Sequence, residues 1–218
     1  MNQVPHPRPA STPPQASDNA SPGVAVDTGP LLCFGLVGPS LLIDRYRGRL
    51  LWAKAVSEEI GNIARTAARR PGNPKVGALQ AEAARKWDRA RTHLGEPQTV
   101  SDRSKVNTMR TLVQDAARRE ATPGRDLGES ETLVLAQQHN SNVLINEIPA
   151  TKVARQLSIP THCALDLLIT LCQEGQIELR TLQKHYEKLR QAEIDPGGTL
   201  PSPCRAKTLA KWNNLAPR

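Results

Sequence analysis

The sequence predicts an α/β fold built on a short parallel β-sheet. Short apolar runs, such as residues 24–26 and 143–145, alternate along the chain with longer amphipathic segments. This alternation is typical of strand–helix–strand units, in which the strands lie parallel because each helix returns the chain to the same end of the sheet. The 218 residues suit one domain with extensions, since domains usually run to ~100–200 residues.

Both ends of the chain have compositions that predict disorder. Residues 1–22 hold six prolines among small and polar residues, and residues 195–218 repeat the pattern with a net basic balance. Such segments carry too little apolar surface to offset the entropy lost on ordering. We therefore expect a folded domain over residues 23–194, between a disordered proline-rich tail and a flexible basic tail.

Each expected strand or helix follows from the local spacing of apolar residues and from the glycines and prolines that begin or end it. Gly29-Pro30 is expected to turn the chain out of the first strand and into a helix, and Gly175 is expected to end a later helix. The expected strands are the apolar runs at residues 24–26, 50–52 and 143–145, with a weaker run at 97–100. The expected helices cover residues 55–69, 76–93, 103–120, 129–139, 150–157, 163–174 and 179–191.

The bulk composition favours a polyanionic partner and excludes several classes of protein. The formal net charge is +8, and cationic side chains that neutralise phosphates release condensed counterions. The longest apolar stretch, residues 30–43, is broken by glycine and proline and is too short to cross a membrane. The N-terminus lacks the pattern of a secretory signal, so we expect a cytoplasmic protein. The four cysteines show no zinc-binding spacing.

Basic residues concentrate in a helical insertion at about residues 64–96. They are either a solvated helical face or a track for the phosphates of a nucleic acid beside a cleft. The residues predicted to contact nucleic acid are Arg65, Arg69, Arg70, Arg85, Lys86 and Arg89.

A carboxylate at the end of the first strand gives the first indication of a site. Asp27 follows the apolar run in the stretch VAVDTGPLL, and ligands of parallel sheets bind beyond the carboxyl ends of the strands. Asp-Thr-Gly also occurs in aspartic proteases, but these need two such aspartates on a mostly β framework, and this chain has one in a helical pattern. The simplest alternative is a helix cap.

Further carboxylates occur at equivalent places in the pattern. They begin two predicted helices, in AVSEEI and DLGESETLVLA, and one follows the apolar run NVLIN. Each alone fits a first-turn acid that complements the helix dipole, whereas together they form a set that a parallel sheet would bring to one edge. The acids concerned are Glu58, Glu59, Glu129, Glu131 and Glu147.

These motifs resemble, in order and spacing, those of the PIN domain, the nuclease fold of many toxins of toxin/antitoxin pairs. VDTGPLL is similar to its first strand and acid, AVSEEI to its second acid and DLGESETLVLA to the Gly-Glu third motif of a bacterial subgroup. VLINEIPATKVARQLSIP is similar to the strand, acid, helix and final strand that close the fold. The resemblance implies a three-layer α/β/α sandwich with a short, mostly parallel central sheet.

The resemblance also implies a metal site. Asp27, Glu59 and Glu129 match the first three ligands. Thr28 matches a hydroxyl that supports the metal or its water. Where the family usually has an aspartate as fourth ligand, this chain has Asn146, which brings an oxygen but no charge.

Neighbouring acids leave the assignment open at three places. Glu58 is the alternative to Glu59. Glu131 lies about 200° round a helix from Glu129 and is expected to support the site rather than share its ion. Glu147, directly after Asn146, is the residue that could replace the missing charge.

Such a set of oxygen ligands favours Mg²⁺ or Mn²⁺. By resemblance, the protein is then a metal-dependent endoribonuclease that hydrolyses RNA phosphodiester bonds, and its implied partners are RNA, an antitoxin protein and a second copy of the chain. The alternative, prompted by Asn146, is a catalytically weak or inactive PIN-like module that binds RNA.

Overall fold

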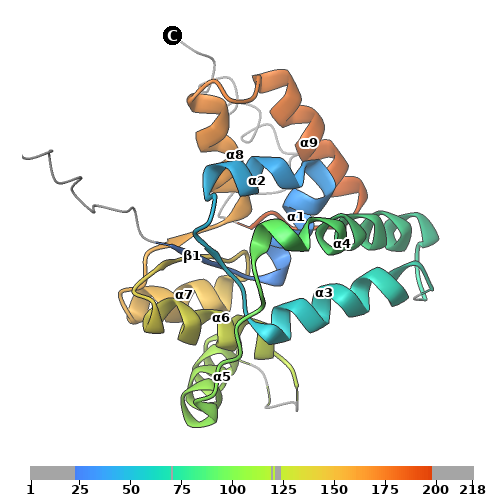
Figure 1. Ribbon diagram of the computed structural model, residues 1–218. Coiled ribbons are helices and arrows are strands. Elements are labelled where there is room, and N and C mark those ends of the chain that lie inside the picture. Colours follow the sequence, from blue (N-terminus) through green and yellow to red (C-terminus); the bar gives the residue numbers. More distant parts are fainter. Residues whose placement is uncertain (1–22, 70, 119, 121–123, 198–218) are drawn as a thin grey trace, which may run out of the picture.

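A four-stranded parallel sheet forms the centre of the protein (Figure 1). The computed structural model describes residues 23–69, 71–118, 120 and 124–197. In the order β2-β1-β3-β4, Ala25 of β1 pairs with Leu51 on one side and Val143 on the other. The strands are β1 (Val24–Val26), β2 (Leu50–Leu51), β3 (Asn142–Leu144) and β4 (Thr161–His162).

Helices cover both faces of this sheet, so that the protein has three layers, α/β/α. Helices α5 (Arg103–Ala117), α6 (Leu127–Gln138) and α7 (Ile148–Gln156) lie on one face (Figure 1). The helices on the other face are α1 (Thr28–Val37), α2 (Pro39–Arg45), α3 (Lys54–Thr66), α4 (Pro74–Leu94), α8 (Ala164–Gln173) and α9 (Leu179–Gln191), with the short 3-10 helix η1 (Ala67–Arg69). The predicted α/β class and the three-layer arrangement around a short parallel sheet are thus confirmed.

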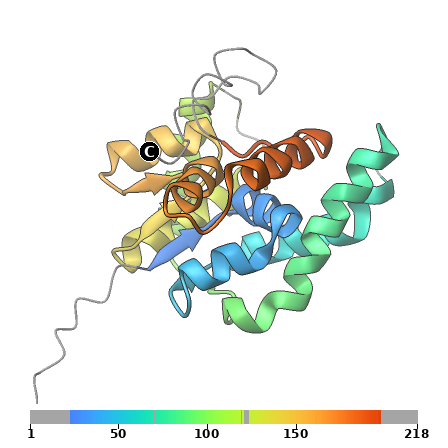
Figure 2. The same cartoon turned by 90° about the horizontal axis from the view of Figure 1, so that it is seen from above.

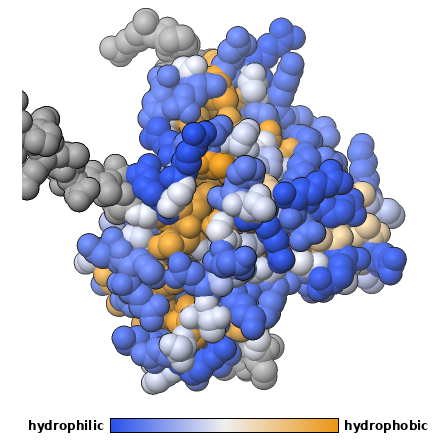
Figure 3. Space-filling model, in the orientation of Figure 1, coloured by the Kyte–Doolittle hydropathy of each residue, from blue (hydrophilic) through white to orange (hydrophobic). Residues whose placement is uncertain are grey.

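Alternation along the strands divides the apolar core in two. Val24 and Val26 pack into the core under α1, α4 and α8, whereas Ala25 between them packs against the α5–α7 layer. In β3, Leu144 joins the first core and Val143 joins the second. Side chains of a strand point alternately to opposite faces, so the central strand β1 needs apolar residues at all three positions. Hydrophilic residues cover most of the outer surface in Figure 3, with apolar residues reaching it in a narrow band.

The predicted basic insertion is packed into the core. Helices α3 and α4 lie side by side and project beyond the sheet (Figures 1 and 2). Trp87 of α4 is fully buried, and its indole N–H donates to the carbonyl oxygen of Leu31 in α1. A Cβ added at Gly35 would lie 2.4 Å from the backbone oxygen of Ala83, so only glycine permits this close approach of α1 and α4.

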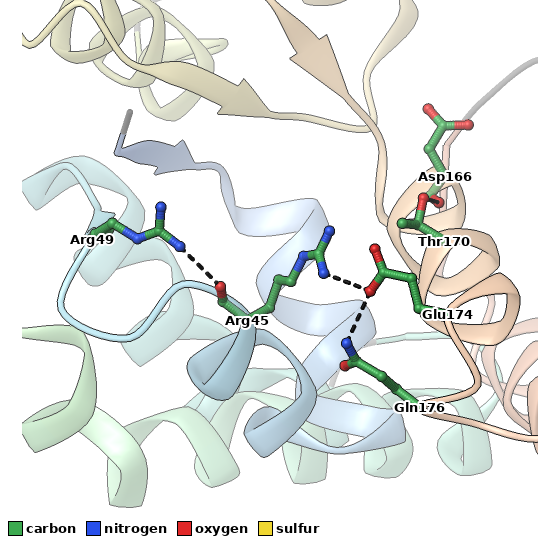
Figure 4. A network of polar contacts seen from close by, with 6 residues as sticks. All are labelled: Arg45, Arg49, Asp166, Thr170, Glu174 and Gln176. Carbon is green, nitrogen blue, oxygen red and sulfur yellow. Dashed lines mark hydrogen bonds and ion pairs between the residues drawn. The ribbon is translucent and has the colours of Figure 1, made fainter. Parts of the chain in front are cut away.

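An ion pair joins α2 to the end of α8 on the same side of the sheet. Arg45 Nη1 donates to Glu174 Oε2 at 2.6 Å, and the Gln176 amide donates to the same carboxylate oxygen at 2.9 Å (Figure 4). Arg49 Nη2 donates to the carbonyl oxygen of Arg45 at 3.3 Å. These arginines are therefore engaged in holding the elements together.

Three details of the sequence prediction are wrong. Gly29 and Pro30 lie in the first turn of α1, where a proline is tolerated because the first amide groups of a helix have no partner within it. Residues 97–100 form a single bridge, Ala53 to Gln98, because Pro97 has no amide hydrogen with which to extend the ladder. The first residues of the predicted flexible tail are packed: Pro196 accepts a hydrogen bond from Leu165.

No helix within the described ranges is long and apolar enough to cross a membrane. The remainder of the two predicted tails, residues 1–22 and 198–218, lies outside those ranges.

Candidate active site

Asp27 occupies the end of β1 with its carboxylate buried. Its backbone N–H donates to the carbonyl oxygen of Leu144, which fixes the residue at the carboxyl end of the sheet. The side chain is 2% exposed, and its Oδ1 atom has no hydrogen-bond partner among the described residues. Although Asp27 is the N-cap residue of α1, its side chain makes no capping hydrogen bond. Because leaving a buried acceptor unpaired costs about 1–3 kcal/mol, local capping does not explain this aspartate.

Glu59, not Glu58, joins Asp27. Thr28 Oγ1 donates to Glu59 Oε2 at 2.7 Å, which ties the first residue of α1 to α3. Glu58 is exposed at the edge of the same hollow and pairs with Lys54, with 3.8 Å between its Oε1 and the Lys54 Nζ. The helical rotation of about 100° per residue separates the two neighbours.

Gly128 allows α6 to approach both carboxylates. A Cβ added there would lie 3.3 Å from Glu59 Oε2 and 3.6 Å from Asp27 Oδ1. The two oxygens therefore lie on the same side of the α6 backbone, in its first turn. The next residue, Glu129, is part of the same first turn. The Gly-Glu motif thus combines a position without a side chain with the acid that follows it.

The acids surround a hollow of about 560 Å³ at the carboxyl end of the sheet. Glu59 and Glu129 line it together with Glu147, the N-cap residue of α7, and Asp27 lies at their inner side against Gly128. Within the described ranges, no three His, Cys, Asp or Glu side chains converge closely enough to hold an ion as they stand. The acids are gathered around one space rather than closed on one point.

Electrostatics within the cluster favour protonation. Burial raises the pKa of Asp27 well above its ordinary value, and the charges of Glu129 and Glu59 raise it further. The N–H groups of Thr28 and Gly29 act in the opposite direction. Burial raises the pKa of Glu129 to about 7, and Glu59 and Glu147 add to the effect. Like charges held together out of water are stabilised by a proton or a cation.

We expect the metal-free protein to lose stability as the pH rises from 5 to 7.5. Unfolded Glu129 releases its proton near its ordinary pKa of 4.5, whereas the folded protein retains that proton up to a pKa of about 7. Between these values the unfolded state is the less protonated, so the free energy of unfolding falls with rising pH, by about 2 kcal/mol. Urea denaturation in EDTA at both pH values measures the change; equal or greater stability at pH 7.5 would contradict the buried acidic cluster.

Glu131, predicted to support the site, is buried and holds the start of the helix that carries Glu59. It is 3% exposed, and its Oε2 accepts a hydrogen bond from the backbone N–H of Ala55 at 3.1 Å. Its Oε1 pairs with Arg103 at 3.0 Å. Ala55 lies in the first turn of α3, where amide groups lack partners within the helix, so Glu131 anchors the helix that carries Glu59.

We expect Glu131→Ala to lower the free energy of unfolding by about 2 kcal/mol, because it leaves the Ala55 N–H and Arg103 without their acceptor. Glu131→Gln, which keeps one amide oxygen, should cost about half as much. Glu178→Ala is the matched control: Glu178 caps α9 without a side-chain hydrogen bond and should change stability by less than about 0.5 kcal/mol. Urea denaturation compares the three; a loss no larger than that of the control would show that the contact is not stabilising.

Asn146, the predicted fourth ligand, has its amide engaged elsewhere. The side-chain oxygen accepts from the Ala164 N–H at 3.0 Å, and the amide nitrogen donates to the carbonyl oxygen of Asp195 at 2.8 Å and to Cys33 Sγ at 3.4 Å. Asn146 does not line the acidic hollow, whereas Glu147 does. The hydrogen-bonding atoms of Asn146 hold the start of α8 and residue 195 to the sheet, and its role as a fourth ligand stays a prediction.

The predicted nucleic-acid contacts are spread over two helices and η1. Arg65, Arg69, Arg85 and Arg89 are exposed, whereas Lys86 is half-buried and pairs with Glu82 at 3.0 Å. Arg70 lies outside the described residues. None of the described five lines the acidic hollow. Two other residues that do, Asn62 and Arg125, were not predicted: nothing in the spacing of the motifs points to Asn62, and Arg125 is distinguished only by its place beside the Gly-Glu motif.

A comparison with known proteins bears on the whole domain. A family model described as a PIN domain matches residues 23–195, from the start of β1 to the segment that packs against Asn146. No curated protein and no solved structure matches the chain. The matched range includes the sheet, both helical layers and every acid of the hollow. The chain belongs to the PIN-domain family, a family of nuclease type.

Proposed function

We propose that the protein is a metal-dependent endoribonuclease whose active site is the acidic hollow. The observation that carries this proposal is the Asp27 carboxylate, buried with an unpaired oxygen and with Glu59 and Glu129 close enough to raise its pKa. Such an arrangement destabilises the folded protein unless something positive binds there. The unpaired Asp27 oxygen lowers the stability of the folded protein, and this supports a role for it in binding a cation.

The residues present fit a hard divalent cation. The unpaired Asp27 oxygen and the carboxylates of Glu59 and Glu129 are all oxygen donors, the kind that suits Mg²⁺ or Mn²⁺ rather than zinc. These three residues would hold the ion, with Glu147 at the rim replacing the charge that Asn146 lacks. When bound, such an ion activates a water molecule and stabilises charge on phosphoryl oxygens.

Other residues keep these acids in place. The Thr28 hydroxyl donates to Glu59 and so holds one of its oxygens in a fixed direction. Glu131 anchors the first turn of α3, and Gly128 leaves room between α6 and the carboxylates. Ligands held by packing and by a second layer of hydrogen bonds are better organised for binding than free side chains.

The RNA substrate, the cytoplasmic location and an antitoxin partner belong to this proposal through the PIN family. A basic chain of net charge +8 supports a polyanionic substrate. The alternative is a module that binds RNA without cleaving it, which is favoured by the engagement of Asn146 away from the hollow. The two differ in one measurable property, since only the nuclease turns over RNA in the presence of a metal.

A pair of neighbouring glutamates gives the sharpest test. We expect purified protein to cleave RNA with Mg²⁺ or Mn²⁺ and not with EDTA, and Glu59→Gln to lower the rate by about 100-fold because a ligand charge is lost. Glu58→Gln removes the same charge from the adjacent position on the wall of the hollow. It should lower the rate less than about threefold, because Glu58 is exposed and pairs with Lys54 rather than with the Thr28 hydroxyl.

The measurement is the rate of cleavage of a labelled RNA by preparations purified in parallel. Equal residual cleavage by wild type and by Glu59→Gln would identify a contaminating nuclease and remove the proposal. Salt-sensitive RNA binding without any metal-dependent turnover would establish the binding module instead.

A further inference from the structure

We infer that Arg125 binds a phosphate of the substrate at the rim of the acidic hollow. The inference rests on the proposed function and adds a residue to it. Five carboxylates belong to the residues that line the hollow, those of Glu58, Glu59, Asp126, Glu129 and Glu147. Arg125 brings the one cationic side chain among the lining residues that the structure describes. The other charged side chains that a phosphodiester would meet on this wall are carboxylates.

Arg125 is available for such a contact. It is exposed and makes no hydrogen bond or ion pair with the described residues, although the carboxylates of the hollow are its neighbours. The arginines at another hollow, between α2 and α8, differ in this respect: Arg45 pairs with Glu174, and Arg49 donates to the Arg45 carbonyl oxygen (Figure 4). Arg125 has five donor hydrogens in a planar arrangement that matches phosphate oxygens.

The backbone on both sides of Arg125 has conformations that are unfavourable in free energy for most residues. The residues on both sides have left-handed conformations, with φ of +76° at Gly124 and +58° at Asp126. Asp126 is not a glycine, so its conformation costs on the order of 1 kcal/mol. It persists because Asp126 is buried and its carbonyl oxygen accepts from the Ser130 N–H at 3.1 Å, which begins α6. This turn sets Arg125 directly beside the motif that carries Glu129.

The charges around Arg125 favour a substrate phosphate, rather than a carboxylate of the protein, as the partner of its guanidinium. An arginine whose role was to neutralise the acidic cluster would pair with one of its glutamates, and Arg125 pairs with none of the described ones. A phosphate would offset the positive charge of the guanidinium, and the acids would hold a cation that offsets theirs. The inferred contact is made equally in the bound substrate and in the transition state. It therefore strengthens substrate binding and changes the rate of the chemical step little.

Arg125→Gln should raise the KM for a labelled single-stranded RNA about tenfold and leave kcat within about twofold. Arg125→Lys, which keeps the charge but not the two parallel donors, should restore part of the loss. Arg180→Gln is the matched control: Arg180 is an exposed arginine of α9, without a partner among the described residues and outside the lining of the hollow. It should leave KM within about twofold.

A second readout does not need turnover. RNA binding by Asp27→Asn protein, followed by fluorescence anisotropy with Mg²⁺, should weaken about tenfold when Arg125→Gln is added and stay unchanged when Arg180→Gln is added. The slope of log affinity against log salt should fall by about 0.7 for the lost phosphate contact. A KM and an affinity equal to those of the control would overturn the inference. If no preparation cleaves RNA with metal but Arg125→Gln still weakens RNA binding, the proposed nuclease function is wrong. The inferred contact between Arg125 and RNA then stands.

Discussion

Asp27→Asn is expected to abolish RNA cleavage and, in the same protein, to raise stability in metal-free buffer. Cleavage should fall by at least about 100-fold, since the buried oxygen pair at the end of β1 loses the charge with which it would hold a cation. The free energy of unfolding at pH 7.5 should rise by about 1–2 kcal/mol, because a carboxylate whose pKa is raised by burial, Glu129 and Glu59 is replaced by a neutral isostere.

The sign of the stability change depends on pH and metal. At pH 5 part of the wild-type cluster is protonated, so the advantage of Asp27→Asn should shrink. Millimolar Mg²⁺ should stabilise the wild type and not the variant, because only the native site gains a ligand that binds the folded state. Urea denaturation with EDTA or with Mg²⁺, beside the cleavage assay, measures both effects. A variant that is less stable than wild type in EDTA would show that Asp27 has a structural role and is not a strained ligand.

The sequence predicted the positions of the acids better than their partners. Asp27 and Glu129 could be placed because strand ends and helix starts are visible in apolar spacing, and parallel strands bring their carboxyl ends to one edge. The choice of Glu59 over Glu58 depends on the rotation of α3, which is fixed by burial of Val56 and Ile60. That apolar spacing is present in the sequence.

What could not be predicted depends on contacts between distant segments. Glu131 is bound by Ala55 and Arg103, which lie 76 and 28 residues away along the chain. The amide of Asn146 is held by residue 195, in a segment that composition alone assigned to a flexible tail. Single-sequence patterns report which face of an element is apolar, and they do not report which buried polar atom meets which. The hydrogen bonds of Asn146 and Glu131 are therefore features that only the fold reveals.

Gly128→Ala is expected to separate activity from stability. The new Cβ would lie 3.3 Å from Glu59 Oε2 and 3.6 Å from Asp27 Oδ1, so the glutamate has to move by a few tenths of an ångström. Cleavage should fall about tenfold, since small displacements of catalytic groups are costly. Stability should stay unchanged or rise by up to about 1 kcal/mol, because residue 128 is helical and alanine favours helix.

Gly61→Ala is the matched control for this prediction. Gly61 is also a helical glycine. Among the described residues, a Cβ there meets within 4 Å only the end of the flexible Arg65 side chain, at 3.3 Å. It should gain the same helical stability and keep full cleavage. Cleavage rates and urea denaturation of the two variants, compared at one pH, decide the matter. If both alanines leave cleavage intact, the space beside Gly128 is not used by the reacting groups. If only Gly128→Ala loses activity while both proteins are as stable as wild type, the glycine of the Gly-Glu motif serves the acidic cluster rather than the fold.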